Sequence, residues 1–136
     1  MNKILNYITY QTFPADTANS LQTISNLKYF VKNSYDVYLY FPLREKQSSD
    51  DLKILQEKYN FSETINIIGS DHPYPFGKLK RLKKIFYHIS HFLWAKKICK
   101  NFSTNSKQSE YFLTRSDWVF YFLAKKNLNI IFECHQ

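Results

Sequence analysis

Residues 111–135, "YFLTRSDWVFYFLAKKNLNIIFECH", hold the pattern that decides the fold. Residues 111–114 and 129–133 are short, almost wholly apolar runs of residues that favour β-strands. The stretch between them, 115–127, has capping residues at its start and lysines in its last turn, as the helix macrodipole favours. Two such runs joined by a helix predict a pair of parallel strands.

The same alternation extends back to the amino terminus. The expected strands are 3–9, 36–42, 64–68, 111–114 and 129–133, and the expected helices are 18–32, 48–60, 78–101 and 115–127. The apolar positions of the first helix recur at helical spacing, at Leu21, Ile24, Leu27 and Val31. Asp16 or Thr17 would cap that helix, and Ser116 or Asp117 the last one. We therefore expect an α/β fold with a Rossmann-like, doubly wound, mostly parallel five-stranded sheet and helices on both faces.

The composition limits the size and class of the protein. A chain of 136 residues supports one domain with one core, here residues 1–136. Apolar content of 44% and only two glycines favour a packed globular fold over disorder or a many-turned β-sandwich. Cys99 and Cys134 form no disulfide or metal pattern, which favours a reduced, intracellular setting. Since we see no secretory signal and no run of about 20 apolar residues, we expect a cytoplasmic protein, soluble or peripheral on the inner face of the plasma membrane.

Positive charge is concentrated in one segment. Between Lys78 and Lys100 the chain has eight basic and no acidic residues, whereas the rest of the chain has 11 of each. In the helix expected here, apolar residues form one stripe, made of Leu79, Leu82, Ile85, Phe86, Ile89, Phe92 and Leu93. Contact with an anionic membrane surface is expected through Lys80, Arg81, Lys83, Lys84, Trp94, Lys96 and Lys97.

Other interpretations of this helix stay open. The helix is alternatively an ordinary amphipathic one, whose apolar stripe packs in the core while its lysines face water. Nucleic acid is a competing polyanion, but no recognition module accompanies the basic residues, so we expect no nucleic-acid partner. His88 and His91 lie three residues apart with no third ligand in reach, so no metal site is expected.

Polar residues follow the first and fourth expected strands, where a parallel sheet presents its reactive edge. Thr17, Asn19 and Ser20 stand at the start of a helix, where they can bind an anion or simply cap the helix. The loop lacks the Gly-x-Gly-x-x-Gly pattern of dinucleotide sites. After the fourth strand, Arg115 suits a carboxylate or phosphate ligand, or else pairs with a surface acid such as Asp117.

The fifth expected strand ends in Glu133, Cys134 and His135. Residues two apart on an extended chain point to the same side, so Glu133 and His135 are expected to share a face. A carboxylate can orient a neighbouring imidazole and raise its pKa. Glu133 and His135 are therefore the sharpest functional signal among the strand ends, although such residues at chain ends are commonly solvated and without function.

Three stretches together resemble a known family. "TFPADTANSLQT" (12–23), "YFLTRS" (111–116) and "IIFECH" (130–135) are similar to the N-terminal domain of family 4 glycosyltransferases of the GT-B fold. The particular resemblance is to bacterial members with the motifs P-x-x-T-A-N-S-x-Q, T-R-S and F-E-x-H. It covers nearly the whole chain, and the long basic helix resembles the membrane-docking helix of that family.

The resemblance implies a retaining sugar transfer without metal or other cofactor, from a nucleotide-sugar donor to a cell-surface glycan or lipid-linked acceptor. His135 would lie beside the donor sugar, near its anomeric carbon, and steady a transition state of oxocarbenium character. Glu133 would orient His135 from behind. The residues expected near the diphosphate or the acceptor are Thr17, Asn19, Ser20, Arg115 and Ser116.

Two features depart from the family pattern. Many members have a Gly-Gly pair in the first loop, and this chain does not. The family also has a C-terminal domain that holds most of the nucleotide site, and residues 1–136 do not include it, so the chain alone is expected to be inactive. The alternative function is a non-catalytic α/β module that docks on an anionic membrane or a partner protein through the basic helix.

Overall fold

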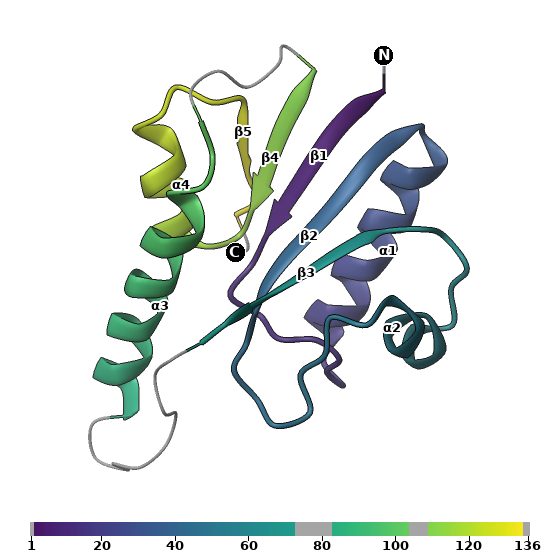
Figure 1. Ribbon diagram of the computed structural model, residues 1–136, viewed down its shortest axis with the longest axis horizontal. Helices are drawn as coiled ribbons and strands as arrows, with labels where there is room; N and C mark the ends of the chain where they lie inside the picture. Colours follow the sequence, from purple (N-terminus) through teal and green to yellow (C-terminus); the bar gives the residue numbers. More distant parts are fainter. Residues whose placement is uncertain (1, 73–82, 104–108, 135–136) are drawn as a thin grey trace.

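The computed structural model describes residues 2–72, 83–103 and 109–134, and within these ranges five strands and four helices alternate (Figure 1). The strands are β1 (Lys3–Ile8), β2 (Tyr35–Leu43), β3 (Asn66–Asp71), β4 (Glu110–Thr114) and β5 (Ile130–Phe132). The helices are α1 (Ala18–Lys32), α2 (Leu52–Tyr59), α3 (Lys83–Cys99) and α4 (Asp117–Ala124).

All five strands run parallel, in the order β3-β2-β1-β4-β5. The central strand, β1, pairs with β2 on one side and with β4 on the other. The chain fills the β2–β3 side first and then crosses to β4, so the strand order reverses between β1 and β4. The doubly wound, parallel α/β fold predicted from the sequence is confirmed.

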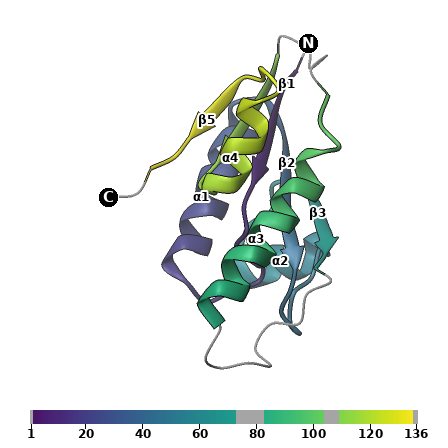
Figure 2. The ribbon, with the colours of Figure 1, turned by 90° about the vertical axis from the view of Figure 1, so that its left-hand side faces the viewer.

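Helices cover both faces of the sheet (Figures 1 and 2), and apolar side chains pack on each face. Successive residues of a strand point to opposite faces. Leu5 and Tyr7 of β1 therefore belong to the cluster that includes α1 and α2 residues, whereas Ile8 belongs to the cluster of α3 and α4. Burial on both faces explains why the strand sequences are almost continuously apolar.

The third strand is longer than the sequence predicted. The predicted strand ended at Ile68, before a loop beginning at Gly69, whereas β3 continues to Asp71 and pairs with the end of β2. A Cβ atom on Gly69 would lie 2.7 Å from Leu43 Cδ2 and 2.8 Å from Asp50 Cβ. Glycine is therefore required here by close packing inside a strand, and not by a turn.

The first helix begins and ends where the sequence predicted. Ile24 and Leu27 are buried as expected, but Leu21 is 56% exposed. Thr23 is fully buried, with its hydroxyl oxygen 3.5 Å from the hydroxyl of Tyr7. The spacing of apolar residues did not predict that Thr23 lies on the buried face of the helix, because it is polar. Its burial depends on the contact with the hydroxyl of Tyr7.

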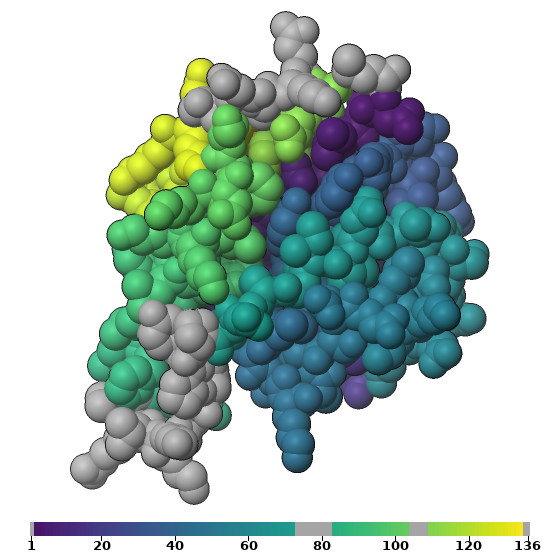
Figure 3. All heavy atoms as spheres, viewed as in Figure 1, coloured from purple at the N-terminus to yellow at the C-terminus, as the bar shows by residue number. Residues whose placement is uncertain are grey.

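The amino-terminal half of α3 presents its apolar stripe to solvent. Ile85, Phe86 and Ile89 are 57%, 44% and 48% exposed, so this part of the stripe does not pack in the core. In the space-filling view the lower part of α3 extends beyond the body of the domain (Figure 3). The buried residues of α3 are Ser90, Trp94, Ala95, Ile98 and Cys99.

Trp94 is a core residue. Its side chain is 2% exposed, and its indole N–H donates a hydrogen bond to Ser70 Oγ at 2.6 Å. The prediction that Trp94 contacts a membrane is therefore wrong. A tryptophan can lie at a membrane interface or in a protein core where its N–H finds a hydrogen-bond partner. The sequence alone does not distinguish these two environments.

The basic residues of α3 retain their exposure. Lys83, Lys84, Lys96 and Lys97 are exposed, whereas Lys80 and Arg81 lie outside the described residues. Among the helices of the described ranges, none combines the length and the apolar character that a bilayer crossing needs.

Candidate functional site

The carboxyl ends of β1 and β4 are the expected place for a ligand. The two strands are neighbours, and the chain leaves them toward α1 on one face of the sheet and α4 on the other (Figure 1). Sheets of this type bind ligands where the strand order reverses. We call the residues at this place the switch-point edge, which comprises residues 9–11, 17–20, 114–116 and Glu133.

Thr17 and Ser20 form a reciprocal cap at the start of α1. The Ser20 N–H donates to Thr17 Oγ1 at 3.2 Å, and the Thr17 N–H donates to Ser20 Oγ at 3.3 Å. Ser20 is fully buried, and its hydroxyl also donates to the Ala15 carbonyl at 2.7 Å. Ser20 therefore stabilises the loop before α1. Because its side chain is buried, it cannot contact a substrate directly, although such a contact had been predicted.

Thr17 and Asn19 are exposed at the same helix start. The Gln11 side-chain amide donates to Thr17 Oγ1 at 3.0 Å, which ties the residues after β1 to the cap of α1. The unpaired N–H groups and the macrodipole make a helix start favourable for anionic ligands. Thr17, Asn19 and Gln11 are the side chains that can reach such a ligand from this side.

Arg115 and Glu133 form a two-pronged ion pair at the ends of β4 and β5. Arg115 Nε donates to Glu133 Oε2 at 2.9 Å, and Arg115 Nη2 donates to Oε1 at 2.8 Å. The two side chains are only 12% and 27% exposed. Burial acts to lower the pKa of Arg115, but the hydrogen bonds to Glu133, together with the charges of Tyr7 and Glu133, outweigh it and the pKa is raised. Arg115 is thus paired with Glu133, and not with the alternative partner Asp117.

The ion pair lies near the core tyrosine of β1. Burial raises the pKa of Tyr7, the hydrogen bond to Thr23 lowers it, and the charges of Arg115 and Glu133 act in opposite directions. Arg115 Nη1 is buried and has no hydrogen-bond partner among the described residues. His135, which Glu133 was expected to orient, lies outside the described residues.

A buried chain of hydrogen bonds links β1, β4, α4 and α3. Thr114 Oγ1 donates to the Ile8 carbonyl at 2.7 Å and accepts from the Ser116 N–H at 3.0 Å. Ser116 Oγ caps α4 by accepting from the Val119 N–H at 3.2 Å, and a 2.6 Å hydrogen bond joins it to His91 Nε2. Ser116 is 6% exposed, so it fixes the end of β4 and does not itself present a side chain to a ligand.

A group of aromatic and basic side chains that was not predicted from the sequence lies on the α3 side of this edge. We call it the aromatic–arginine cluster, and its members are Tyr10, Arg44, His72, Tyr87 and His91. Tyr10 stacks on His91 with 4.1 Å between ring centroids, and its hydroxyl lies 2.7 Å from His72 Nε2. Arg44 Cζ lies 4.6 Å from the ring centroid of Tyr10 and 5.6 Å from that of Tyr87.

One signal in the sequence could have found this cluster. Tyr10, Arg44 and His72 each follow the end of a strand by one or two residues, at Ile8, Leu43 and Asp71. Because parallel strands end at one edge of a sheet, residues that directly follow neighbouring strands come together there. The contribution of α3 depends on the orientation of that helix, which the sequence did not give.

The low pKa of His91 is expected to make the free energy of unfolding depend on pH. Burial lowers its pKa to about 4, and the positive charges of Arg44 and His88 act in the same direction. Below the ordinary imidazole pKa of about 6.5, the unfolded chain binds a proton that the folded chain does not, so stability falls as the pH falls. Between pH 7 and 5.5 we expect the wild type to lose about 1 kcal/mol more unfolding free energy than His91→Gln, measured by urea denaturation. Equal losses in the two proteins would contradict this role.

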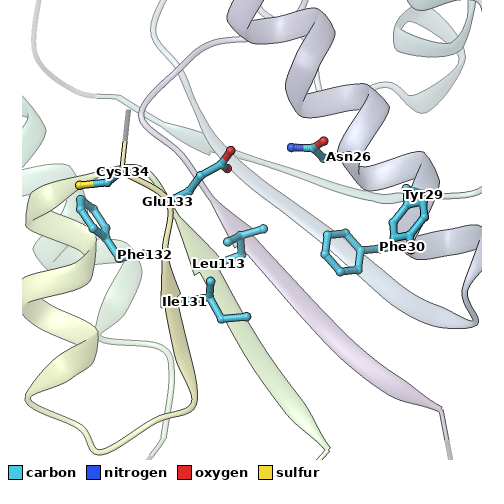
Figure 4. A pocket seen from close by; sticks show the side chains of 8 residues that line it. All are labelled: Asn26, Tyr29, Phe30, Leu113, Ile131, Phe132, Glu133 and Cys134. Carbon is cyan, nitrogen blue, oxygen red and sulfur yellow. The ribbon is translucent and has the colours of Figure 1, made fainter. Parts of the chain in front are cut away.

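An apolar groove opens between α1 and the β4–β5 side of the sheet, next to Glu133 (Figure 4). Its volume is about 510 Å³, and its lining residues are Asn26, Tyr29, Phe30, Leu113, Ile131, Phe132, Glu133 and Cys134. Ile131 is 51% exposed, although strands of parallel sheets are normally covered on both faces. None of the described helices covers this part of the sheet, so the two faces are unequally covered.

The structure brings some of the predicted site residues together. Arg115 contacts Glu133, Thr17 contacts Ser20, and both pairs lie at the same edge because β1, β4 and β5 are consecutive in the sheet. Asn19 is exposed at that edge. The side chains open to a ligand are thus fewer than predicted, because Ser20 and Ser116 are buried caps.

Comparison of the chain with known proteins identified no similar protein. No protein-family model, curated protein or solved structure matches the chain. The resemblance to family 4 glycosyltransferases rests on three short motifs.

Proposed function

We propose that this chain is the acceptor-side half of a retaining, metal-independent glycosyltransferase of the GT-B type. It would work with a nucleotide-sugar-binding domain, supplied by a second domain or a partner subunit. The observation that carries the proposal is the convergence of the three motif stretches. Residues 17–20, Arg115 and Glu133 follow three strands that are consecutive in the sheet, at the place where the strand order reverses.

The described residues of the edge suit an acceptor with polar and anionic groups. Thr17 and Asn19 offer hydrogen-bonding side chains at the positive end of α1. Arg115 is held in a fixed orientation by Glu133, and in this proposal the ion pair forms the wall of the site beside the acceptor. In this proposal His135 lies beside the sugar at the anomeric carbon and stabilises the positive charge that develops there.

A chimaeric enzyme tests this function. We would fuse the nucleotide-sugar domain of a family 4 glycosyltransferase after Gln136 and assay transfer from labelled nucleotide-sugars to glycan and lipid-linked acceptors. The chain alone is expected to transfer no sugar, and the fusion is expected to transfer it with retention of configuration and with no effect of EDTA. His135→Ala in the fusion is expected to lower kcat about 100-fold or more, as for other groups that stabilise charge in a transition state.

Several outcomes would contradict the proposal. Sugar transfer by the 136-residue chain alone would refute the division of labour between two halves. Inversion of configuration, or loss of activity with EDTA, would refute the retaining, metal-independent mechanism. Cys134→Ser serves as the matched control for His135→Ala, because Cys134 is adjacent, exposed and given no role in the reaction.

The exposed half of α3 favours a second candidate function, docking on an anionic membrane. Ile85, Phe86 and Ile89 are exposed together, with Lys83 and Lys84 on the same turns. Exposed apolar side chains with flanking lysines are typical of helices that lie in a membrane interface. This function is compatible with a transferase that uses a lipid-linked acceptor, and it also stands alone as a non-catalytic role.

Vesicle co-sedimentation tests membrane docking. With phosphatidylcholine vesicles that contain about one-third phosphatidylglycerol, Lys83→Glu/Lys84→Glu is expected to weaken binding at least tenfold, since each basic residue near the surface contributes about 1 kcal/mol. Lys46→Glu/Lys53→Glu makes the same change in net charge at exposed positions outside α3 and is expected to have little effect. Equal weakening by both double variants would show that only net charge matters and would remove α3 as the docking surface.

A further inference from the structure

Helices α3 and α4 together present an apolar surface to solvent. The two helices pack against each other on one face of the sheet (Figures 1 and 2). Residues three or four apart lie on one side of a helix, which groups the outward apolar side chains of each helix into a row. We call the two rows the α3–α4 face, and its members are Ile85, Ile89, Phe92, Trp118, Tyr121 and Phe122.

Contacts between aromatic rings join the two rows. The centroid of the Phe92 ring lies 4.9 Å from that of Trp118 and 5.3 Å from that of Phe122. The Tyr121 ring lies 6.2 Å from Trp118 and 5.3 Å from Phe122, again between centroids. Tyr121 is 46% exposed and Ile89 is 48% exposed, while the other three rings are half-buried. A contiguous exposed patch of this kind marks a contact surface, whereas single exposed apolar residues are ordinary.

Packing in the core does not explain the apolar character of α4. Val119 and Leu123 are its buried residues, and they fill the side of the helix that faces the sheet. A surface helix normally carries polar residues on its outer side, but Asp117 is the only charged residue of α4. The aromatic residues between Asp117 and Leu123 therefore exceed what the core requires.

Lysines border the α3–α4 face. Asp117 is the only acidic residue of the two helices. The bordering lysines are all exposed, and they are Lys83, Lys84, Lys96 and Lys125. Lys96 continues the row of α3, four residues after Phe92. An apolar surface with a basic border is complementary to a surface that is apolar inside and anionic at its rim.

The outer end of α4 has the form of an interfacial anchor. Lys125 Nζ donates a hydrogen bond to the Tyr121 hydroxyl at 2.6 Å, and it lies 4.1 Å from the centroid of that ring. The apolar ring thus has a polar hydroxyl and an ammonium group at one end. Tyrosine rings and lysine stems behave in this way at membrane–water interfaces, with the ring among the lipids and the charge at the headgroups.

We propose that the α3–α4 face docks on an anionic lipid surface, with the aromatic side chains of α4 inserted among the lipids beside those of α3. The proposal adds α4 to the membrane docking suggested for α3, and it rests on that second candidate function. A second copy of the chain fits this face less well, because face-to-face contact would bring the lysines of both copies together.

Docking in this orientation would place lipid headgroups next to the switch-point edge. Ser116 of that edge is the N-cap of α4 and precedes Trp118 by two residues. His91 of α3 is hydrogen-bonded to the same serine at 2.6 Å. For a transferase with a lipid-linked acceptor, the acceptor would therefore reach the edge while its lipid stays in the bilayer.

The two tryptophans of the chain test the proposal by fluorescence in the full 136-residue protein. Trp118 belongs to the α3–α4 face, whereas Trp94 is 2% exposed in the core. Bromine atoms on acyl chains quench only the indoles that they contact. With phosphatidylcholine vesicles that carry brominated chains and contain about one-third phosphatidylglycerol, we expect the wild-type emission to be quenched. Trp118→Phe, which retains only Trp94, is expected to bind without quenching, and quenching of both proteins or of neither would overturn the proposal.

Neighbouring residues of α4 provide a second test by vesicle co-sedimentation. Tyr121→Ala removes an exposed ring from the α3–α4 face and is expected to weaken binding about fivefold or more, because the ring no longer inserts. Phe120→Ala is the matched control, since Phe120 is 38% exposed on the same helix but its ring contacts Phe132 of β5, at 5.0 Å between centroids. It is expected to have little effect, and equal weakening by the two variants would overturn the proposal.

The outcomes separate this proposal from the functions on which it builds. Binding that depends on Lys83 and Lys84, without quenching of Trp118 or an effect of Tyr121→Ala, would overturn the role of α4 and leave docking by α3 standing. An absence of vesicle binding would overturn both. Self-association of the lipid-free chain that Tyr121→Ala abolishes would assign the face to a second copy instead. None of these measurements depends on sugar transfer, so an inactive fusion enzyme would leave the docking surface standing.

Discussion

Trp94→Ala is expected to lower the free energy of unfolding by about 3 to 5 kcal/mol, the usual cost of removing a large aromatic side chain from a core. The residue is 2% exposed, it packs among the α3 and α4 core residues, and its indole N–H donates to Ser70 Oγ. A loss of this size is a large part of the stability of a domain of this length. Urea denaturation followed by circular dichroism measures it without relying on tryptophan fluorescence.

Trp118→Ala is the matched control, because Trp118 is the other tryptophan of the chain and is only partly buried. Its ring makes an edge contact with Phe92, at 4.9 Å between centroids, and we expect a loss of about 1 to 2 kcal/mol. If Trp94→Ala instead left stability unchanged and weakened vesicle binding, Trp94 would be a membrane contact and the packing of α3 described above would be incorrect.

Breaking the Arg115–Glu133 pair is expected to have the second largest effect. Arg115→Met leaves a carboxylate half-buried at the end of β5, and we expect it to cost about 2 to 3 kcal/mol, less than a fully buried pair because both side chains retain some exposure. Glu133→Gln is expected to cost about 2 kcal/mol. In a double-mutant cycle the two losses should not add, since they remove one interaction.

The exposed pair of Lys58 and Asp16 is a control for this cycle, because its side chains are 41% and 85% exposed. It is expected to show no measurable coupling. Additive losses at Arg115 and Glu133 would mean that the two side chains are not bonded in solution. The fixed orientation of Arg115, on which its proposed place beside the acceptor depends, would then be lost.

Most of the fold could be predicted from the sequence because its signals are local. The apolar runs around Tyr7, Leu39 and Leu113 specify buried parallel strands. Thr17 and Ser116 are each one of the two residues predicted to cap their helix, and they are the caps in the structure. The extent of β3 was missed, because Gly69 serves close packing and not a turn. The residues around a glycine do not show whether it serves close packing in a strand or a turn.

The candidate site was predicted less completely. The place was foreseen, since strand ends in a parallel sheet share an edge, and Arg115 and Glu133 do meet there. Their pairing with each other was not foreseen, because each had a nearer partner in the sequence. Ser20 and Ser116 were assigned to substrate although the same residue types cap helices, and the buried cap is what the structure shows.

The orientation of α3 was the main feature that the sequence left undetermined. Packing of its apolar stripe in the core stayed open as an alternative to membrane contact, and in the structure Ile85 and Ile89 face solvent while Ser90 and His91 face inward. A polar residue can be buried when it finds a partner, as His91 does in Ser116. Such partners come from other elements, so helical periodicity cannot locate them. The same reason explains why the aromatic–arginine cluster was missed.

The central claim is that a ligand of the acceptor type binds at the switch-point edge. The most direct test is an amide chemical-shift map of the isotope-labelled chain titrated with a water-soluble acceptor analogue, N-acetylglucosamine linked through pyrophosphate to a short farnesyl chain. We predict saturable shifts concentrated at residues 9–11, 17–20 and 114–116, which follow β1 and β4. Shifts confined to the exposed half of α3, or an absence of saturable shifts, would contradict the claim and leave membrane docking as the better account of this protein.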